Sequence, residues 1–394
     1  KPFKFPPPAG FQPLNAANAR PVKVFARPDQ FVKPVLYDGN NGTKQVTTGL
    51  QADFIWIKGR SETLQHRLVD SVRGDFQLHT NGNAAQSAWT GLDILSNGFN
   101  VTNDGNEQNK TGTNYVAWTW RAGGGTPGTS GDEFWKDGVQ YASAAAANIT
   151  QGTLPLSAAS IGTKQGFSIC QYTSPSSADG STWGHGLSQA PDFIISRMLN
   201  SGGDWSTYNS GDPTKYMLLN SNAGGAGSSN WTVTGTTVTM GAGLWTSTSQ
   251  PSIAYHWHNV PGLQKFGKYT CNGDGSGGGA EDGPFVELGF RPSMILFKGA
   301  NYTSDWTWID NVRCTINYND VALRANYANA EIGNSRGGVG GSSQPENYAV
   351  DFLSNGFKIR ASGGSLNSGT NEVVYAAWAE APTFNLYGAQ SNAR

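Results

Sequence analysis

The chain has 394 residues, enough for two or three domains with sizeable hydrophobic cores. Its 27 lysines and arginines are balanced by 28 aspartates and glutamates, so no basic surface is expected to attract nucleic acid or an anionic membrane. No run approaches the roughly 18 apolar residues of a membrane span, and 52 glycines with only 14% charged residues suit short strands joined by tight turns.

Residues 1–35 are predicted to form a proline-rich leader. Prolines recur from Pro2 to Pro34 and remove backbone donors at intervals, so neither a helix nor a regular sheet ladder is expected there. Extended packing against a neighbouring domain is the favoured interpretation. The chain begins at Lys1 with neither a methionine nor a signal peptide, which predicts a fragment or a processed form of a longer protein.

Three stretches of the chain repeat the same phrases in the same order, which predicts three tandem modules. Asp53–Lys58 returns as Asp192–Arg197 and, more loosely, as Ser293–Lys298. Each stretch then ends in an aromatic segment that closes on a tryptophan. The predicted division is a leader at 1–35, β repeats at 36–122, 167–260 and 261–383, an insertion at 123–166 and a tail at 384–394.

The hydrophobic pattern within a repeat predicts β-strands. Phe54–Ile57 is a continuous apolar run, typical of a strand covered on both faces. The closing segment alternates instead, and the face that carries every second residue from Val116 to Trp120 is predicted to be the one that faces the core. Ser96–Gly98 predicts a hairpin in which Asn-Gly takes the positive φ of a type I′ turn. The fold class is therefore predicted to be all-β, with three β-sandwich-like modules.

Large aromatic residues are the predicted core. Trp120, Trp257 and Trp378 occupy corresponding places at the ends of the closing segments, and Trp56 lies in the first apolar run. The three cysteines fall at non-equivalent places in the repeats, so buried thiols are expected rather than a disulfide framework, although one disulfide stays open as an alternative.

The insertion at 123–166 is rich in Gly, Ser and Ala. Gly123–Gly125 within it, and Gly277–Gly279 further along the chain, are predicted to be flexible linkers. The run Ala144–Ala147 is the one segment whose composition favours a helix.

One charged pair recurs, as Asp70 with Arg73 and as Asp310 with Arg313. Both copies are predicted to be structural ion pairs that fix a strand end or a turn; a ligand-binding arginine is the alternative. Because isolated surface pairs contribute little stability, the recurrence suggests partial burial. The second repeat lacks the pair and has Ser206–Asn209 nearby.

Neither a metal nor a cofactor is expected. His256 and His258 have the spacing of two metal ligands on one strand, but no third ligand is placed by the sequence, so histidines with ordinary hydrogen-bond partners are favoured. Asn103–Glu107 and Asp274 only loosely resemble calcium loops. No nucleophile elbow, Walker loop or zinc-protease motif occurs, and a paired-carboxylate glycosidase site stays open because sequence does not show which loops converge.

Tryptophans outside the predicted strands are the candidate glycan-binding residues. They are flanked by Gly, Ser, Thr and Asn, a setting that suits stacking on sugar rings beside hydrogen-bonding amides. Core packing is favoured for each one singly, so the prediction of glycan binding rests on these tryptophans as a set. The candidates are Trp183, Trp231, Trp135 and Trp245.

Nearly the whole chain resembles a family of virion-associated proteins of marine tailed phages. Lys1–Leu14 resembles the segment that follows a SPRY or laminin-G-like module in these proteins, and Phe384–Arg394 resembles their natural end. The phrases that resemble the repeated domain between them are Asp53–Lys58, Val69–Gly74, Ser96–Phe99 and Tyr115–Trp118. The resemblance implies a phage structural protein, and it carries over no site residue.

The predicted function is that of a non-enzymatic virion protein: a fibre, tail or capsid appendage on the particle surface that contacts host-surface glycans. Its partners would be other virion proteins and host glycan, and a fibre would assemble as a homotrimer. The first alternative is a purely structural decoration protein. The second is a glycan-degrading tailspike, which is disfavoured because such enzymes are often β-helices with rungs of about 20–30 residues, far shorter than the repeat at 37–120.

Overall fold

The computed structural model describes residues 27–102, 107–125, 133–175, 180–228, 231–240, 249–273, 282–333, 345–361 and 363–380. These residues form β-strands and turns with two short 3-10 helices, η1 (Pro28–Gln30) and η2 (Pro345–Tyr348), and contain no α-helix. The predicted all-β fold is therefore confirmed. No helix in this part of the chain is long and apolar enough to cross a membrane.

The first module is a sandwich of two antiparallel sheets. The strand order of its larger sheet is β1 (Val32–Asp38), β9 (Asn114–Trp120), β3 (Phe54–Gly59) and β4 (Arg67–Asp70). The order of its smaller sheet is β2 (Lys44–Thr47), β8 (Gly98–Val101) and β7 (Leu92–Leu95). A separate two-stranded ribbon follows β4 and consists of β5 (Phe76–Gln77) and β6 (Ser87–Ala88).

The third module repeats this plan. The larger sheet has the order β22 (Gln264–Thr270), β29 (Glu372–Ala379), β24 (Pro292–Gly299), β25 (Thr307–Asp310) and β26 (Leu323–Arg324). The smaller sheet has the order β23 (Phe285–Glu287), β28 (Gly356–Ile359) and β27 (Val350–Leu353).

The second module has the same plan with an extended larger sheet. Its central strands are β13 (Phe167–Ser174), β21 (Gln250–Trp257), β15 (Phe193–Met198), β16 (Ser206–Asn209), β17 (Lys215–Leu218) and β18 (Ala226–Ser228). Beyond β13 the sheet continues with β12 (Leu156–Gly162), β10 (Phe134–Lys136) and β11 (Val139–Tyr141). The smaller sheet consists of β14 (Thr182–Gly184), β20 (Thr237–Met240) and β19 (Trp231–Val233).

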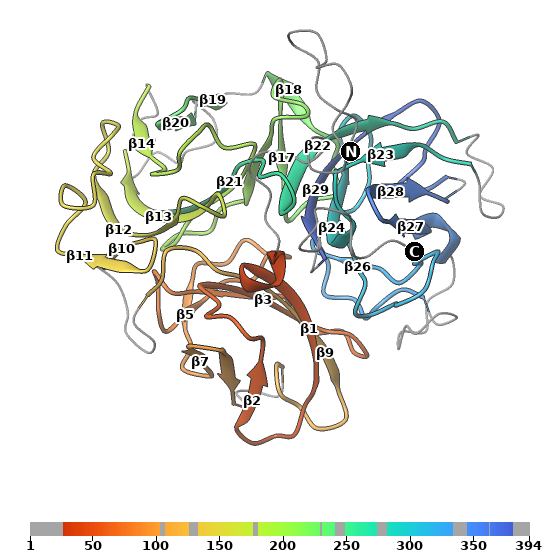
Figure 1. The fold of residues 1–394 in the computed structure, drawn as a ribbon, viewed down its shortest axis with the longest axis horizontal. Helices are drawn as coiled ribbons and strands as arrows, with labels where there is room; N and C mark the ends of the chain where they lie inside the picture. The colour runs from red at the N-terminus through yellow and green to blue at the C-terminus, as the bar shows by residue number, and fades with distance from the viewer. Residues whose placement is uncertain are drawn as a thin grey trace, which may run out of the picture.

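The three larger sheets begin with the same arrangement. In each of them an opening strand (β1, β13 or β22) pairs with the closing strand (β9, β21 or β29), which pairs on its other side with the strand of the apolar run. The register agrees as well, because Trp120, Trp257 and Trp378 lie opposite the first residues of the opening strands. The three modules form three lobes around a common centre (Figure 1).

The centre of the molecule is a hydrophobic core that all three modules share. Trp120, Trp257 and Trp378 meet there: the ring centroids of Trp120 and Trp378 are 5.3 Å apart, and those of Trp257 lie 6.2 Å from both. Each ring is at most 2% exposed, and Trp56 in β3 is 1% exposed in the same core. The tryptophans predicted for the core thus join the modules to one another.

Each sandwich also has a core of its own, between its two sheets. The closing strands are therefore buried on both faces: Val116 and Trp118 point into the shared core, while Tyr115 and Ala117 fill the interior of the first sandwich. The prediction that only one face meets a core was incomplete, because the alternation reflects two cores of different composition.

The hairpin predicted at Ser96–Gly98 is present between β7 and β8, but its predicted turn type is wrong. Leu95 pairs with Gly98, so Ser96 and Asn97 form the turn, and neither has a positive φ. Glycine is needed for another reason: a Cβ on Gly98 would lie 2.1 Å from the carbonyl oxygen of Val46 on the adjacent strand.

Of two segments predicted to lack regular structure, one belongs to a sheet and the other packs against one. Residues 32–35 of the predicted leader belong to β1, which tolerates Pro34 because β1 is an edge strand of its sheet. Gly123–Gly125 is not a flexible linker, because a Cβ on Gly123 would lie 2.4 Å from the backbone of Ile161. Ala144–Ala147 forms turns rather than a helix, and Gly277–Gly279 lies outside the described residues.

Candidate functional site

The recurring ion pairs hold the modules together. In the first module the Arg73 Nε donates to Asp70 Oδ2 at 2.6 Å, and the hydroxyl of Tyr255 in the second module donates to the same oxygen at 2.7 Å. Both partners of the pair are at most 1% exposed. In each module a turn follows the strand β4, β16 or β25 and contacts the next module, and we call this contact a junction.

The other two junctions have corresponding geometry. In the third–first junction the Arg313 Nε donates to Asp310 Oδ2 at 2.6 Å, and the indole of Trp118 donates to that oxygen at 2.9 Å. In the second–third junction Asn209 occupies the position of the aspartate, and its Nδ2 donates to the Tyr375 carbonyl oxygen at 3.2 Å. The predicted ion pairs therefore have structural partners in the neighbouring module.

Three buried cations occupy one corresponding position in the strands of the apolar run. Burial lowers the pKa of Lys58 to about 7 and that of Lys298 to about 8. Arg197 reaches into the first module, where its Nη1 donates to the Gly82 carbonyl oxygen at 3.2 Å, and Lys298 reaches Asn222 of the second module at 3.0 Å. Lys58 donates instead to the Gly59 carbonyl oxygen of its own module at 2.6 Å, and all three groups are buried away from a ligand.

Two of the tryptophans predicted to bind glycan are buried. Trp183 is 0% exposed, stacks on Tyr172 with a centroid distance of 4.6 Å, and donates from its Nε1 to His256 Nε2 at 2.9 Å. Trp231 is 7% exposed and packs edge-on against Trp183. The prediction that these rings are exposed for stacking on sugar is wrong, because β14 and β19 place them in the core between the two sheets of the second module.

The other two candidate tryptophans are Trp135 and Trp245. Trp135 in β10 is half-buried, and its Nε1 donates to Glu133 Oε2 at 2.8 Å. Trp245 lies outside the described residues, so its role stays a prediction. Of the three candidates that the structure describes, two lie in the core of the second module, so these three assemble no exposed aromatic cluster.

The two histidines with metal-ligand spacing have different surroundings. His256 is fully buried; its Nε2 accepts from Trp183, and its Nδ1 lies 3.2 Å from the Ser168 hydroxyl. His258 follows the end of β21, and its Nδ1 lies 2.7 Å from the amide nitrogen of Gln189. Burial lowers the pKa of both rings, so both are neutral near pH 7. His256 has no ring nitrogen left for a metal ion.

Carboxylates do not gather into a metal site in the part of the chain that the structure describes. No group of three His, Cys, Asp or Glu side chains there could hold an ion. The loosely calcium-like loops fall mostly outside it, since residues 103–106 and 274–281 are not described. The three cysteines are buried, and no disulfide joins them.

The second module carries two adjoining pockets, which we call the paired pocket. Their volumes are about 470 and 230 Å3, and they share Thr163 and Ser188. The larger one is further lined by Lys164, Gln189, His258, Asn259, Val260 and Pro261. The smaller one is further lined by Lys136, Asn148, Gln151, Gly186, Leu187 and Thr236. The larger volume lies in the range of about 300–1,000 Å3 that is usual for small-ligand sites.

Hydroxyl and amide groups dominate the lining of the paired pocket. Asp137 holds Thr163 at its centre: the Thr163 backbone N–H donates to Oδ1 at 2.8 Å and its hydroxyl to Oδ2 at 2.6 Å. Ser188 and Gln189 are exposed. Such groups can donate to and accept from the hydroxyls of a sugar, and the lining has no carboxylate to act as a general acid or base.

Sequence reasoning missed the paired pocket because it assigned no strand to the insertion. Lys136, Asn148 and Gln151 all come from that insertion. A usable signal was present in Asp137–Gly138, since Asp-Gly between short apolar runs is a strong hairpin signal. In the structure these two residues have φ values of 52° and 86° and connect β10 to β11.

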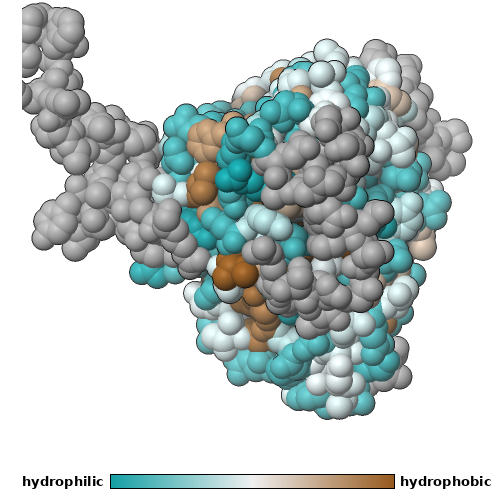
Figure 2. Space-filling view, turned by 90° about the vertical axis from the view of Figure 1, so that its right-hand side faces the viewer, coloured by the Kyte–Doolittle hydropathy of each residue, from teal (hydrophilic) through white to brown (hydrophobic). Residues whose placement is uncertain are grey.

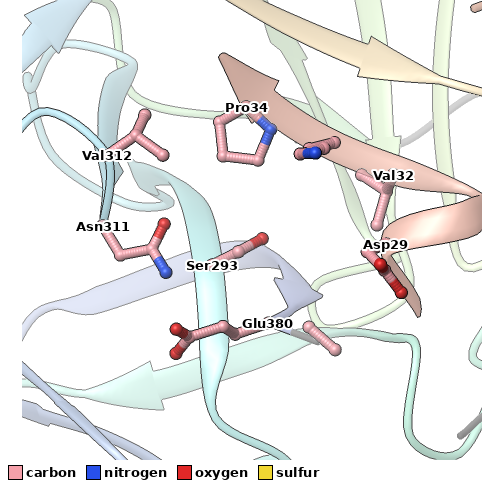
Figure 3. Close-up of a pocket in the computed structure, with 9 residues that line it drawn as sticks. Asp29, Val32, Pro34, Ser293, Asn311, Val312 and Glu380 are labelled. Carbon is pink, nitrogen blue, oxygen red and sulfur yellow. The ribbon is translucent and has the colours of Figure 1, made fainter. Parts of the chain in front are cut away.

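A third pocket lies between the first and third modules (Figure 3). Its volume is about 270 Å3. β1 and the residues before it contribute Asp29, Val32, Lys33 and Pro34. The third module contributes Ser293, Asn311, Val312, Ala379 and Glu380, which face β1 across the opening.

A family model described as a domain of unknown function, DUF7483, matches residues 27–134 and 133–382. No curated protein matches the chain. No solved structure matches it either.

Proposed function

The chain belongs to the DUF7483 family, a domain of unknown function, and we propose that it is a non-enzymatic structural protein of a virion that contacts host-surface glycan. The resemblance of its opening, its repeats and its end to virion-associated proteins of tailed phages supports the virion assignment. The paired pocket is the observation that supports glycan contact.

The shared core suits a protein that must present a binding surface in a fixed orientation. Buried rings from three modules contact one another in it, as Trp120, Trp257 and Trp378 show. Loops and pockets on such a scaffold are held in place relative to each other, and recognition residues are often carried by loops on rigid sheets. The scaffold would display the paired pocket on the particle surface.

Glycan is the proposed ligand because of the chemistry of the lining. Exposed hydroxyl and amide groups at Ser188, Gln189 and Asn148 can form several hydrogen bonds to a polyol at once. With a formal net charge of −1, the chain has little overall charge to steer binding, so the dependence on salt should be weak.

The test is a binding assay with purified host-surface polysaccharide. We expect the double variant Lys164→Ala and Gln151→Ala to lose binding, because both side chains line the paired pocket and neither has a hydrogen bond that the sandwich needs. Lys268→Ala, at a half-exposed ion pair with Glu372 on the third module, is the matched control and should bind normally. Undiminished binding by the double variant would remove the paired pocket as the glycan site.

A purely structural decoration role is the second candidate. The burial of Trp183 and Trp231 favours it, because the aromatic rings first assigned to glycan lie in a core. Electron microscopy of intact particles separates the two: a chain in contact with the capsid lattice supports decoration, whereas a distal position supports adhesion. Failure of the wild-type protein to bind any host surface would also favour decoration.

A further inference from the structure

The three junctions differ in what lies beside the opening strand of the next module. In the first–second junction, the chain that leaves β9 and the strand β12 lie between the turn and β13. The Ser71 hydroxyl is 3.4 Å from the Gly124 carbonyl oxygen, which also accepts from Ser160 of β12 at 2.5 Å. β12 then pairs along β13, antiparallel to it. An added strand therefore covers this edge.

The second–third junction is closed by direct contact. A Cβ on Gly211, in the turn after β16, would lie 2.4 Å from the backbone of Gly267 in β22. Glycine at position 211 lets the turn and the opening strand touch, so no strand fits between them.

In the part of the chain that the structure describes, a pocket takes the place of an added strand at the third–first junction. Asn311 and Val312 form the turn, and Val32 and Pro34 belong to the opening strand β1. Between them lies the pocket of about 270 Å3 shown in Figure 3. Among the described residues, β9 is the only strand that pairs with β1.

The backbone of β1 presents hydrogen-bonding groups on the side of the strand that faces away from β9. Lys33 O accepts from the Thr119 hydroxyl at 2.6 Å and Gly39 N–H donates to Thr113 O at 2.9 Å, so the odd-numbered residues face β9. Since a residue in an antiparallel pair directs its N–H and C=O to the same side, the groups of Val32, Pro34 and Leu36 point outward. Pro34, which has no N–H, occupies one of these outward places.

We propose that β1 is a docking edge for an extended segment of a partner polypeptide, which adds to the sheet antiparallel to β1 as β12 adds to β13. Strand addition at an exposed sheet edge is a general mode of peptide recognition, in which backbone hydrogen bonds provide affinity. Leu36 on β1 is 41% exposed, a large apolar side chain that an added strand would cover.

The corresponding junction defines the chemistry of the partner. Gly162, Ser160 and Ala158 of β12 lie opposite Phe167, Ile169 and Gln171, which correspond to Val32, Pro34 and Leu36. Ser160 lies close to the chain that leaves β9, since its hydroxyl donates to the Gly124 carbonyl oxygen at 2.5 Å, and a Cβ on Gly162 would meet the Gln165 side chain, so small side chains fit at these places. The partner segment should therefore carry Gly, Ala or Ser at alternate positions.

Among the described residues on the side of the molecule that Figure 2 shows, no broad apolar surface is present. The coloured residues on the side that Figure 2 shows are mostly hydrophilic, and the apolar ones form a narrow, broken band. Recognition at this junction would thus depend on backbone pairing more than on a large hydrophobic area. The proposal is independent of glycan binding, which concerns the second module.

The test is amide hydrogen exchange of the full chain with a synthetic peptide that has the sequence of residues 154–164. We expect the peptide to slow exchange at Val32 and Leu36, while Lys33 and Val35, already paired with β9, change little. A peptide with prolines in place of Ala158 and Ser160 is the control and should have no effect.

Two substitutions at one position sharpen the test. Leu36→Pro removes an outward N–H and, like Pro34, leaves the ladder with β9 intact, so it should abolish peptide binding. Leu36→Ala keeps the N–H and should retain binding. Equal binding by Leu36→Pro, or protection of Val32 and Leu36 in the isolated wild-type chain, would overturn the proposal. Protection that rises with protein concentration would also overturn it, because the occupant would then be a second copy.

Discussion

The first–second and second–third junctions reach the same geometry with different chemistry. In the first–second junction a buried aspartate is neutralised by Arg73 and accepts from Tyr255. In the second–third junction Asn209 donates to a backbone carbonyl, and no ion pair is involved. The partner residues vary accordingly: Trp118 and Tyr255 have polar hydrogens to donate, whereas Ala376 at the corresponding place has none.

This difference shows that the position of the turn, rather than the charge, is common to the junctions. Removing two charges from water is costly, and a buried pair gains stability only when its remaining groups are hydrogen-bonded. The neutral amide at Asn209 avoids that cost where the neighbouring module cannot supply a donor. Breaking a charged junction is costly, because the aspartate or the arginine that loses its partner would remain buried as an uncompensated charge.

The largest expected effect comes from a substitution in the hydrophobic core that the three modules share. Trp378→Ala should lower the free energy of unfolding by about 3–5 kcal/mol, as is typical for a buried aromatic side chain. Denaturant unfolding checks this, with Trp135→Ala as the control: Trp135 is half-buried, and its loss should cost about 1 kcal/mol. An unchanged midpoint for Trp378→Ala would contradict a shared core.

The next largest effect is a loss of stability that should differ between the two charged junctions. Asp70→Ala strands Arg73 in a buried place and should cost about 3–4 kcal/mol. Asp310→Ala should cost less, about 2 kcal/mol, because Glu331 lies 3.3 Å from Arg313 and still compensates its charge. Chemical denaturation of both variants measures the difference, and equal losses would show that Glu331 does not support Arg313.

A pH effect sharpens the comparison of the buried cations. Burial lowers the pKa of Lys58 to about 7 in the folded protein, whereas the pKa of this lysine in the unfolded chain is near 10.5. Between these two pH values the unfolded state therefore binds more protons than the folded state. Stability should therefore rise with pH from about 7 to 9.5, where the tyrosines are still protonated. Lys58→Met should flatten the curve of unfolding free energy against pH, and Lys268→Met should not. Parallel curves would mean that Lys58 keeps its ordinary pKa.

The smallest effect is expected at the uncharged junction. Asn209→Ala removes the hydrogen bond to Tyr375 and the one that Asn209 Oδ1 accepts from the Gly211 N–H, and should cost about 1–2 kcal/mol, the usual net value of two neutral hydrogen bonds. Thermal unfolding beside Asp70→Ala tests the ranking. A loss as large as that of Asp70→Ala would show that the charge on the aspartate is not what makes the first–second junction costly to break.

Local patterns predicted the strands well. The run Phe54–Ile57 forms β3, which is buried throughout its length, as a continuous apolar segment predicts. The hairpin at Ser96–Gly98 was also located, because turn residues between apolar runs act through local geometry. The turn type of this hairpin was predicted wrongly, because Gly98 is required by the close approach of Val46, which lies on a strand distant in the sequence.

The candidate site was predicted poorly for a related reason. Trp183 and Trp231 have polar neighbours in the sequence, yet their side chains point between two sheets whose pairing depends on residues up to several tens of positions away. Burial is a property of that pairing. The paired pocket likewise needs the insertion to pack beside β13, which no local pattern specifies.

The sequence by itself determined the all-β class, the repeated strand phrases and the tryptophans that close them, because hydrophobic periodicity and turn residues act over a few positions. Only the tertiary structure decided that these tryptophans meet in one core, that Asp70 accepts from Tyr255, and that β12 covers the edge of β13 whereas β9 alone pairs with β1 among the described residues. Such outcomes depend on which surfaces approach one another in space, and the contacts that fix them join residues distant along the chain.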